Sequence, residues 1–307
     1  MSSQVLSFST MWAQQERFAD LARFRRLIAV FGYTGIEVSH STEAAGLELL
    51  AGDGELALTS LHAPTPRRKL ADGRVNGDAN LASTDEAERR LAVTETARTV
   101  DFAAAAGLPY VVIHLGGVGN HVTEPERGLR RLVETGEGEG ELAEETRAAL
   151  HRLRAQAVDA HLDAARRSLR ELVAQAAPRG VALGLESRLH YHEIPHPDEA
   201  LDLLADYANE VAGYWHDVGH CEVQARLGLI DRGAWFPKLT QRTIGSHLHD
   251  VDGILDHRAP GNGDVDWSYI AAGLPRDALR VFEINQGQPD DRVAASIDYL
   301  RRRGVVE

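Results

Sequence analysis

The chain has 307 residues, of which 43% are hydrophobic and 26% are charged. This composition is typical of a globular protein, and one α/β barrel can occupy this length, so we expect a single domain over residues 1–307. Forty-six acidic against 33 basic residues give a formal net charge of −13, which disfavours nucleic acid as a partner.

The cysteine count and the N-terminal residues indicate in which cellular compartment we expect the protein. The single cysteine, Cys221, excludes an internal disulfide. The polar run from Gln14 to Arg17 stands where a signal peptide would need an apolar segment. No apolar stretch approaches the roughly 20 residues that cross a bilayer. We therefore expect a cytoplasmic protein with no membrane partner.

Short β-rich runs alternate with longer amphipathic segments along the whole chain. This alternation predicts parallel strands joined by right-handed helical crossovers, and eight repeats favour a closed (β/α)8 TIM barrel. The predicted strands are Val5–Ser9, Gly35–Ser39, Leu56–His62, Tyr110–Leu115, Val181–Ser187, Val211–His216, Ile244–His249 and Leu279–Asn285.

Three predictions concern the connecting segments. Ser83 and Glu86 have capping-box spacing and predict a helix that ends near Gly107. Residues 141–177 have a helical period but are long for one barrel helix, so we expect a break or an overhang. Residues 120–140 alternate glycine with glutamate near their end, and we expect a mobile insertion there, either a lid or a solvated loop.

Chemically distinctive residues stand at the ends of the last four predicted strands. Glu186, Asp217, His247 and Glu283 follow successive apolar runs. Because barrel enzymes carry their sites at the carboxyl ends of the strands, we expect these four side chains to meet. Three converging carboxylates would repel one another without a cation, so the set predicts a divalent metal site. Oxygen ligands with one imidazole suit Mn²⁺ first, with Zn²⁺, Co²⁺ and Mg²⁺ as alternatives.

Two earlier strands end in histidine, at His62 and His114. Each one alone can equally be a buried structural histidine, but as a pair they favour the site. Arg188, beyond Glu186, and His257, on the loop after the seventh strand, add candidate substrate-binding groups. His257 is also a candidate ligand of a second metal.

At these residues the chain resembles the xylose-isomerase-like TIM-barrel superfamily, which includes sugar phosphate isomerases and epimerases, inosose dehydratases and AP endonuclease family 2. The resemblance covers nearly the whole chain and is specific for the superfamily rather than for one member. Its carriers are Leu61–Pro64, Ile113–Gly116, Gly184–Ser187, His216–His220, His247–Asp250, His257 with Pro260–Trp267, and Phe282–Asn285.

The resemblance implies roles for individual residues. In the isomerase and epimerase branches, the residues matching Glu186, Asp217, His247 and Glu283 bind the metal, and those matching His220 and Arg258 commonly touch substrate. In the endonuclease IV branch, the residues matching His62, His114, His220 and His257 also bind zinc. That branch has an aspartate two residues before the last histidine, where this chain has Leu255.

We interpret the chain as a metal-dependent isomerase or epimerase of a sugar, sugar phosphate or cyclic polyol. Glu186 and Glu283 would move the proton through an enediolate, with the metal and His220 stabilising the charge. An inosose-type dehydratase on the same site, an endonuclease IV-like zinc phosphodiesterase and a catalytically idle binding barrel are the alternatives. The basic run Arg67-Arg68-Lys69 either holds a substrate phosphate or is a solvated loop. A homo-oligomer is expected from base rates alone.

Overall fold

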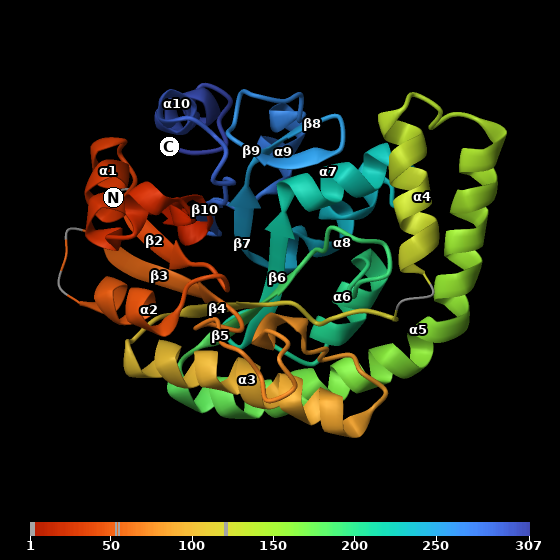
Figure 1. Ribbon diagram of the computed structural model, residues 1–307, viewed down its shortest axis with the longest axis horizontal. Coiled ribbons are helices and arrows are strands. Elements are labelled where there is room, and N and C mark those ends of the chain that lie inside the picture. The colour runs from red at the N-terminus through yellow and green to blue at the C-terminus, as the bar shows by residue number, and fades with distance from the viewer. Residues whose placement is uncertain (1–3, 53, 55, 120–121) are drawn as a thin grey trace.

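The computed structural model describes residues 4–52, 54, 56–119 and 122–307, in which eight parallel strands close into a barrel (Figure 1). The strands follow one another around the barrel in chain order, and the last pairs with the first. This confirms the (β/α)8 class and all eight predicted strands, whose bounds differ by at most three residues from those expected. The barrel strands are β1 (Leu6–Ser9), β2 (Gly35–Val38), β3 (Ala57–His62), β4 (Tyr110–Ile113), β5 (Ala182–Glu186), β6 (Ala212–Asp217), β7 (Thr243–Leu248) and β10 (Leu279–Phe282).

Helices surround the barrel and connect its strands (Figure 1). Within the described residues, none of them combines the length and the apolar character that a membrane crossing needs. The helices are α1 (Leu21–Val30), α2 (Ala44–Ala51), α3 (Glu86–Ala105), α4 (Thr123–Glu134), α5 (Glu141–Ala176), α6 (Pro197–Leu204), α7 (Val218–Arg226), α8 (Phe236–Leu239), α9 (Trp267–Gly273) and α10 (Asp290–Arg301).

A small apolar cluster from five strands lies apart from the larger core that the helices share. It is built from Val112, Ala182, Trp215, Ile244 and Val281, each on a different strand. Trp215 is fully buried, and a Cβ on Gly184 would lie 2.7 Å from its ring, so a glycine is needed beside it. The Trp215 ring lies 5.5 Å from the ring of His247 and forms an apolar support for that histidine.

The predicted capping box at the start of α3 is wrong. The helix begins at Glu86, and the carboxylate of Asp85 caps it by accepting from the backbone N–H groups of Ala87 and Glu88. The hydroxyl of Ser83 instead accepts from the N–H of Asp85. Both side chains are good capping groups; in the folded chain Asp85 occupies the cap, where its charge also interacts favourably with the helix dipole.

The expected loop insertion is also corrected, because much of it is helix α4. Residues 120 and 121 of that stretch lie outside the described residues. Leu129 is fully buried, and Glu126 on the same face is nearly so. Helix α5 is continuous over 36 residues, so the break offered as one alternative is not present. Figure 1 shows the first part of α5 standing beside α4 and its last part running beside α3.

A short antiparallel ribbon, absent from the sequence prediction, follows β7. Strands β8 (Asp250–Asp252) and β9 (Leu255–Arg258) pair on the loop that leads to α9. His257 in β9 has φ of 53°, the one positive value among the described non-glycine residues. Such a conformation is costly for a residue with a Cβ and persists only where the surroundings hold it.

Candidate active site

The strand register brings the four predicted metal ligands together. Asp217, the last residue of β6, pairs with His247 of β7, and His247 pairs with Val281 of β10, two residues before Glu283. Glu186 is the last residue of β5. Parallel strands of matched register end at the same rim, so the four side chains share one site.

The imidazole of His247 is the centre of this cluster. Its Nδ1 lies 2.8 Å from Glu186 Oε1, 3.2 Å from Glu283 Oε2 and 3.5 Å from Asp217 Oδ2. One ligand atom from each of the four residues lies within 4.8 Å of every other. All four side chains are buried, at 0 to 1% exposed. The predicted ligand set is therefore close enough to share one ion.

Glu37, which the sequence analysis missed, contacts the opposite side of His247. Its Oε1 lies 2.9 Å from His247 Nε2, and its Oε2 accepts from the Ser60 hydroxyl at 2.7 Å. Glu37 is the third of the four residues of β2 and is followed by Val38, whereas Glu186 is the last residue of β5. A carboxylate that holds the far nitrogen of a ligand histidine fixes the ring orientation and its tautomer.

His62 and His114 reach the same site from β3 and the end of β4, as predicted. Their Nε2 atoms lie 2.5 Å apart, and that of His114 is 2.6 Å from Glu186 Oε2. The His62 ring lies between two carboxylates, with Nε2 3.3 Å from Glu186 Oε2 and Nδ1 3.5 Å from Glu283 Oε1. His62, His114 and Glu186 form a second group that can hold an ion.

A third group lies on the other side of Asp217. His220, His249 and His257 converge there, and His249 Nε2 is 2.9 Å from Asp217 Oδ1. The family resemblance places an aspartate at the position of Leu255, but its neighbour Asp256 reaches the group instead. Asp256 Oδ2 lies 3.1 Å from His257 Nδ1 and 3.8 Å from His220 Nε2. The four histidines proposed as second-metal ligands therefore divide between two groups.

Two arginines were predicted to touch substrate, and they lie differently. Arg188 Nη1 is 2.6 Å from Glu186 Oε2, and its Nε donates to Glu193 Oε1 at 3.0 Å. Arg258 ends β9 and lies 3.9 Å from Asp252, and within the described residues it forms no ion pair with the four central ligands. The structure thus brings Arg188 into the cluster and leaves Arg258 at its edge.

The loop that carries Arg188 is tied to α4 through Glu126. This buried carboxylate accepts from the N–H of Tyr191 at 2.9 Å and lies 2.9 Å from His190 Nδ1. His192 Nδ1 is 3.4 Å away. Helix α4 therefore holds the loop after β5, which supplies a cation to the cluster.

Burial and mutual attraction set the charges in the cluster. Burial alone would raise the pKa of Glu186, but His62, His114 and Arg188 outweigh it and hold that pKa well below its usual range. Burial would lower the pKa of His62, yet Glu186 and Glu283 raise it to about 9. Burial, with Arg188, lowers the pKa of His114 to about 3. The pKa values of the two neighbouring histidines thus shift in opposite directions, because His62 lies between two carboxylates whereas burial dominates at His114.

The donor set fits a divalent cation. Glu37, Glu186, Asp217 and Glu283 are four buried carboxylates in one cluster, and Arg188 is the guanidinium that contacts it. The buried Nδ1 of His62 has no hydrogen-bond partner among the described residues. A cation would balance this excess of buried negative charge, and carboxylate oxygens with one imidazole suit Mn²⁺, Zn²⁺, Co²⁺ or Mg²⁺.

Fold and site together define an α/β barrel with a buried carboxylate–imidazole cluster at its strand ends. The chain belongs to the Xylose isomerase-like TIM barrel family, whose profile matches residues 25–303. The family resemblance seen in the sequence is thereby confirmed.

Solved structures with this fold cover almost the whole chain. A D-tagatose 3-epimerase-like protein is 18% identical, with a TM-score of 0.67 and coverage of 98% of this chain and 97% of the other. The 3-keto-D-glucoside 4-epimerase YcjR of E. coli is 17% identical, with a TM-score of 0.64 and coverage of 97% and 99%. The TTHB071 protein of Thermus thermophilus, soaked with ZnCl2, is 23% identical, with a TM-score of 0.58 and coverage of 98% of each chain. At these identities the likeness establishes the fold.

One curated relative is similar over part of its length. The uncharacterized protein y4fM of Sinorhizobium fredii is 25% identical over 144 residues. The match spans 46% of this chain and 44% of the relative, so each is matched over less than half its length.

Proposed function

We propose that the protein is a divalent-metal-dependent isomerase or epimerase of a sugar, sugar phosphate or cyclic polyol. One observation carries the proposal: Glu186, the last residue of β5, and Glu283, directly after β10, face the same nitrogen of His247 at 2.8 and 3.2 Å. Two carboxylates converging from different strands are suited to act on one carbon from two sides. The epimerases among proteins of the same fold are consistent with this chemistry.

Glu186, Asp217, His247 and Glu283 would hold the metal, with Mn²⁺ the first choice for this donor set. When bound, the ion supplies Lewis acidity that makes the C–H beside a carbonyl group more acidic. Glu37 would keep the His247 ring in place through its contact with Nε2.

Glu186 and Glu283 would carry the proton. Each has one oxygen near His247 and the other near His62, at 3.3 Å for Glu186 Oε2 and 3.5 Å for Glu283 Oε1. One carboxylate removes the proton from the substrate carbon, and the other returns a proton to the opposite face, which inverts that carbon.

Neighbouring groups would bind and orient the substrate. Arg188 and His220 supply hydrogen-bond donors for the negative charge that develops on the substrate oxygens as an enediolate. His62, His114 and His257 are further hydrogen-bonding groups at this rim. An inosose-type dehydratase would use the same residues, except that a β-hydroxyl group leaves after the proton is removed. The substrate would be a small polyhydroxylated molecule rather than nucleic acid.

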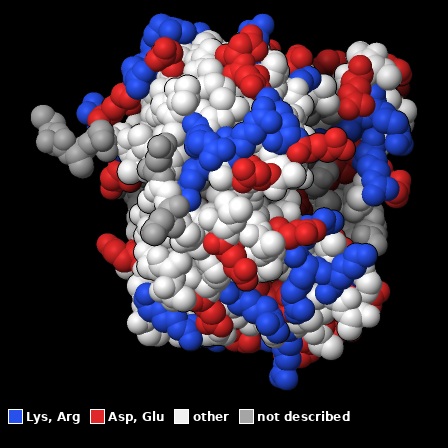
Figure 2. Space-filling model, turned by 60° about the vertical axis from the view of Figure 1, so that its left-hand side comes forward, with Lys and Arg blue, Asp and Glu red and all other residues white. Residues whose placement is uncertain are grey.

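A second candidate, an endonuclease IV-like zinc phosphodiesterase, is favoured by two of the further groups that could hold an ion, His62–His114–Glu186 and Asp217–His220–His249–His257. Asp256 provides a carboxylate near His220 and His257, as a third ion would need. The net charge of −13 opposes this candidate, because a protein that grips several phosphates needs a basic surface. On the face shown in Figure 2, basic and acidic side chains are interspersed.

The test is proton exchange in D₂O with the metal-loaded protein. A panel of ketoses and inososes is incubated with protein loaded with Mn²⁺, Co²⁺, Mg²⁺ or Zn²⁺, and NMR follows deuterium entering the carbon beside the carbonyl. Exchange with product formation supports the proposal. Cleavage of abasic DNA without exchange on any sugar would support the second candidate. The absence of both activities would contradict both candidates.

A further inference from the structure

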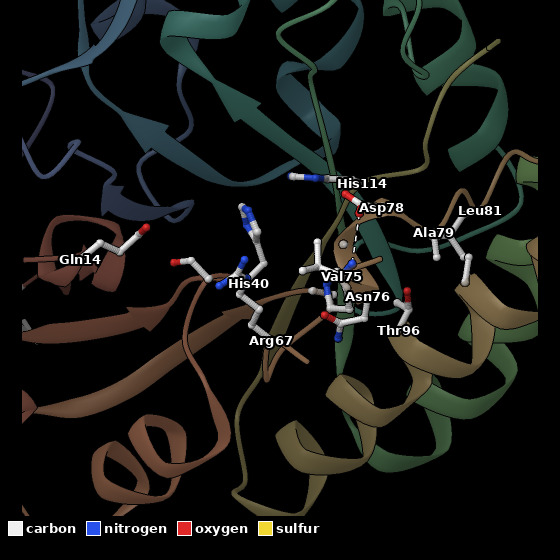
Figure 3. Close-up of a pocket in the computed structure, with 15 residues that line it drawn as sticks. Gln14, His40, Arg67, Val75, Asn76, Asp78, Ala79, Leu81, Thr96 and His114 are labelled. Atoms are coloured by element: carbon white, nitrogen blue, oxygen red, sulfur yellow. Dashed lines mark hydrogen bonds between the residues drawn. The ribbon is translucent and has the colours of Figure 1, made fainter. Parts of the chain in front are cut away.

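A cavity of about 360 Å³ opens beside the cluster on the β2–β4 side of the barrel (Figure 3). Its size falls in the range of small-molecule sites. The loops after β1, β2 and β3 and the end of β4 contribute to its wall, and its polar lining residues are Gln14, His40, Ser41, Arg67, Asn76, Asp78, Thr96 and His114.

Two histidines connect this cavity to the proposed reaction centre. His114 lines the cavity and also places its Nε2 2.6 Å from Glu186 Oε2. The His40 ring is 5.1 Å from the ring of His62 and 5.7 Å from that of His114. A substrate whose reacting carbon lies at Glu186 therefore has this cavity open to its remaining atoms.

The cavity wall holds a polar group without an internal partner. The Nδ1 atom of His40 is buried, and among the described residues it has no hydrogen-bond partner. A buried polar atom of this kind is unfavourable until water or a ligand meets it. His40 therefore lines the cavity and carries a buried ring nitrogen that no described residue satisfies.

The basic run after β3 divides into residues with different surroundings. Arg68 donates through Nε to Glu95 Oε2 at 2.6 Å and is held by that contact. Lys69 does not line the cavity, whereas Arg67 does. No described carboxylate forms an ion pair with Arg67, and its backbone is fixed by a hydrogen bond from its N–H to Thr42 O at 2.8 Å.

Arg67 is the one arginine or lysine among the described lining residues, and Asp78 the one carboxylate. In Figure 3, Arg67 appears with Gln14 and His40 on one side of the cavity, and Asp78 on the other. The Asp78 carboxylate accepts a hydrogen bond from the backbone N–H of Val75 at 3.1 Å, so one of its oxygens already has a partner. A ligand approaching the Arg67 side therefore meets an uncompensated guanidinium.

We propose that this cavity binds the part of the substrate remote from the reacting carbon, and that Arg67 binds an anionic substituent there, a phosphate or a carboxylate. The inference rests on the proposed function, which places the reacting carbon at Glu186 and Glu283. A guanidinium pairs with either anion through two parallel hydrogen bonds, so it prefers a charged substrate end to a neutral one.

The kinetic test compares D-fructose, D-fructose 6-phosphate and D-fructuronate, which differ only in the group at the end of one carbon skeleton. Deuterium exchange is measured with the wild type, Arg67→Met and the matched control Lys69→Met, each loaded with Mn²⁺. The preferred anionic sugar should lose about 10- to 100-fold in kcat/KM in Arg67→Met, through KM, because one charge-assisted contact is lost. Neutral D-fructose and the Lys69→Met variant should change less than about twofold.

A binding measurement tests the Arg67 subsite even if none of these sugars is turned over. Calorimetry follows D-fructose 6-phosphate, D-fructuronate and inorganic phosphate binding to the same three proteins. Binding that weakens in Arg67→Met alone supports the subsite, and the stronger of the two anionic sugars identifies phosphate or carboxylate. Equal binding by all three proteins, or none by the wild type, overturns it. Exchange on D-fructose without any Arg67 effect would contradict the subsite and leave the proposed function standing.

Discussion

Glutamates at the strand ends and glutamates on the outer helices have opposite surroundings. Glu37, Glu186 and Glu283 are 0 to 1% exposed and surround one imidazole. Glu124 on α4 and Glu144 on α5 have side chains 71 and 67% exposed, and each pairs with an arginine three residues on. The Glu124–Arg127 pair is exposed at both side chains and contributes little because water screens it, whereas buried carboxylates must be neutralised locally. Burial therefore distinguishes the glutamates of the candidate site from glutamates on the solvated surface, although the residue type is the same.

The largest effect is expected where the two proposed proton carriers are neutralised. Glu186→Gln and Glu283→Gln should each lower the exchange rate by about 10²- to 10⁴-fold, since general acid–base groups contribute that much. NMR exchange in D₂O measures it, with Glu144→Gln as the exposed control. If both buried variants keep an exchange rate within a few-fold of the wild type, Glu186 and Glu283 do not carry the proton.

The next effect concerns the carboxylate behind His247. Glu37→Gln should weaken metal affinity by about 10- to 100-fold, because groups that orient a ligand histidine have effects of that size. A metal titration followed by Trp fluorescence is suitable, since Trp215 lies beside His247. The same titration of Glu144→Gln should match the wild type. If Glu37→Gln also matches it, Glu37 does not position the ligand.

Glu126 tests a buried glutamate outside the proposed metal cluster. Burial would raise its pKa, but hydrogen bonds to His190 and His192 outweigh burial and lower it below the usual range. Glu126→Gln should cost about 2 kcal/mol of unfolding free energy near pH 6, because hydrogen bonds to a charged group are lost. A depressed carboxyl pKa stabilises the fold above the unfolded value, near 4.5, and this contribution is lost as the pH falls.

Urea unfolding of the wild type and Glu126→Gln at several pH values between about 6 and 3 measures that difference. The gap between the two proteins should narrow as the pH decreases. A gap that stays constant, or widens towards acid pH, would show that the ionised carboxylate is not what stabilises the loop after β5.

The smallest effect belongs to the exposed pairs. Arg127→Ala breaks the ion pair with Glu124 and should change the free energy of unfolding by less than about 1 kcal/mol. The change should shrink further in about 1 M salt, which screens exposed charges. A salt-insensitive loss of several kcal/mol in urea unfolding would mean that the outer helices depend on such pairs.

Sequence periodicity was enough to predict the barrel, and strand-end position was enough to predict that Glu186, Asp217, His247 and Glu283 meet. That rule misses Glu37, because Glu37 lies inside β2 and is followed by Val38; a charged residue within a short apolar run is the signal that would have identified it. His249, directly after β7, could have been found from its strand-end position. Asp256 could not, because it lies on the β8–β9 ribbon, which the strand pattern did not predict. Helix α4 was missed because its few apolar residues, such as Leu129 and Leu132, are separated by many charges. The local pattern at Ser83 and Asp85 offered two caps, and only the folded backbone selects one.

Counting the metal in purified protein tests the central claim most directly. Elemental analysis of the wild type, Glu186→Ala, Glu283→Gln and the exposed control Glu144→Gln, each dialysed after loading, gives the ions held per chain. The account predicts about one Mn, Co, Mg or Zn per chain in the wild type and the control, and loss in the two buried variants. Two or three zinc ions per chain would favour the phosphodiesterase candidate. No metal under any loading condition would contradict the metal-assisted proton transfer proposed for this barrel.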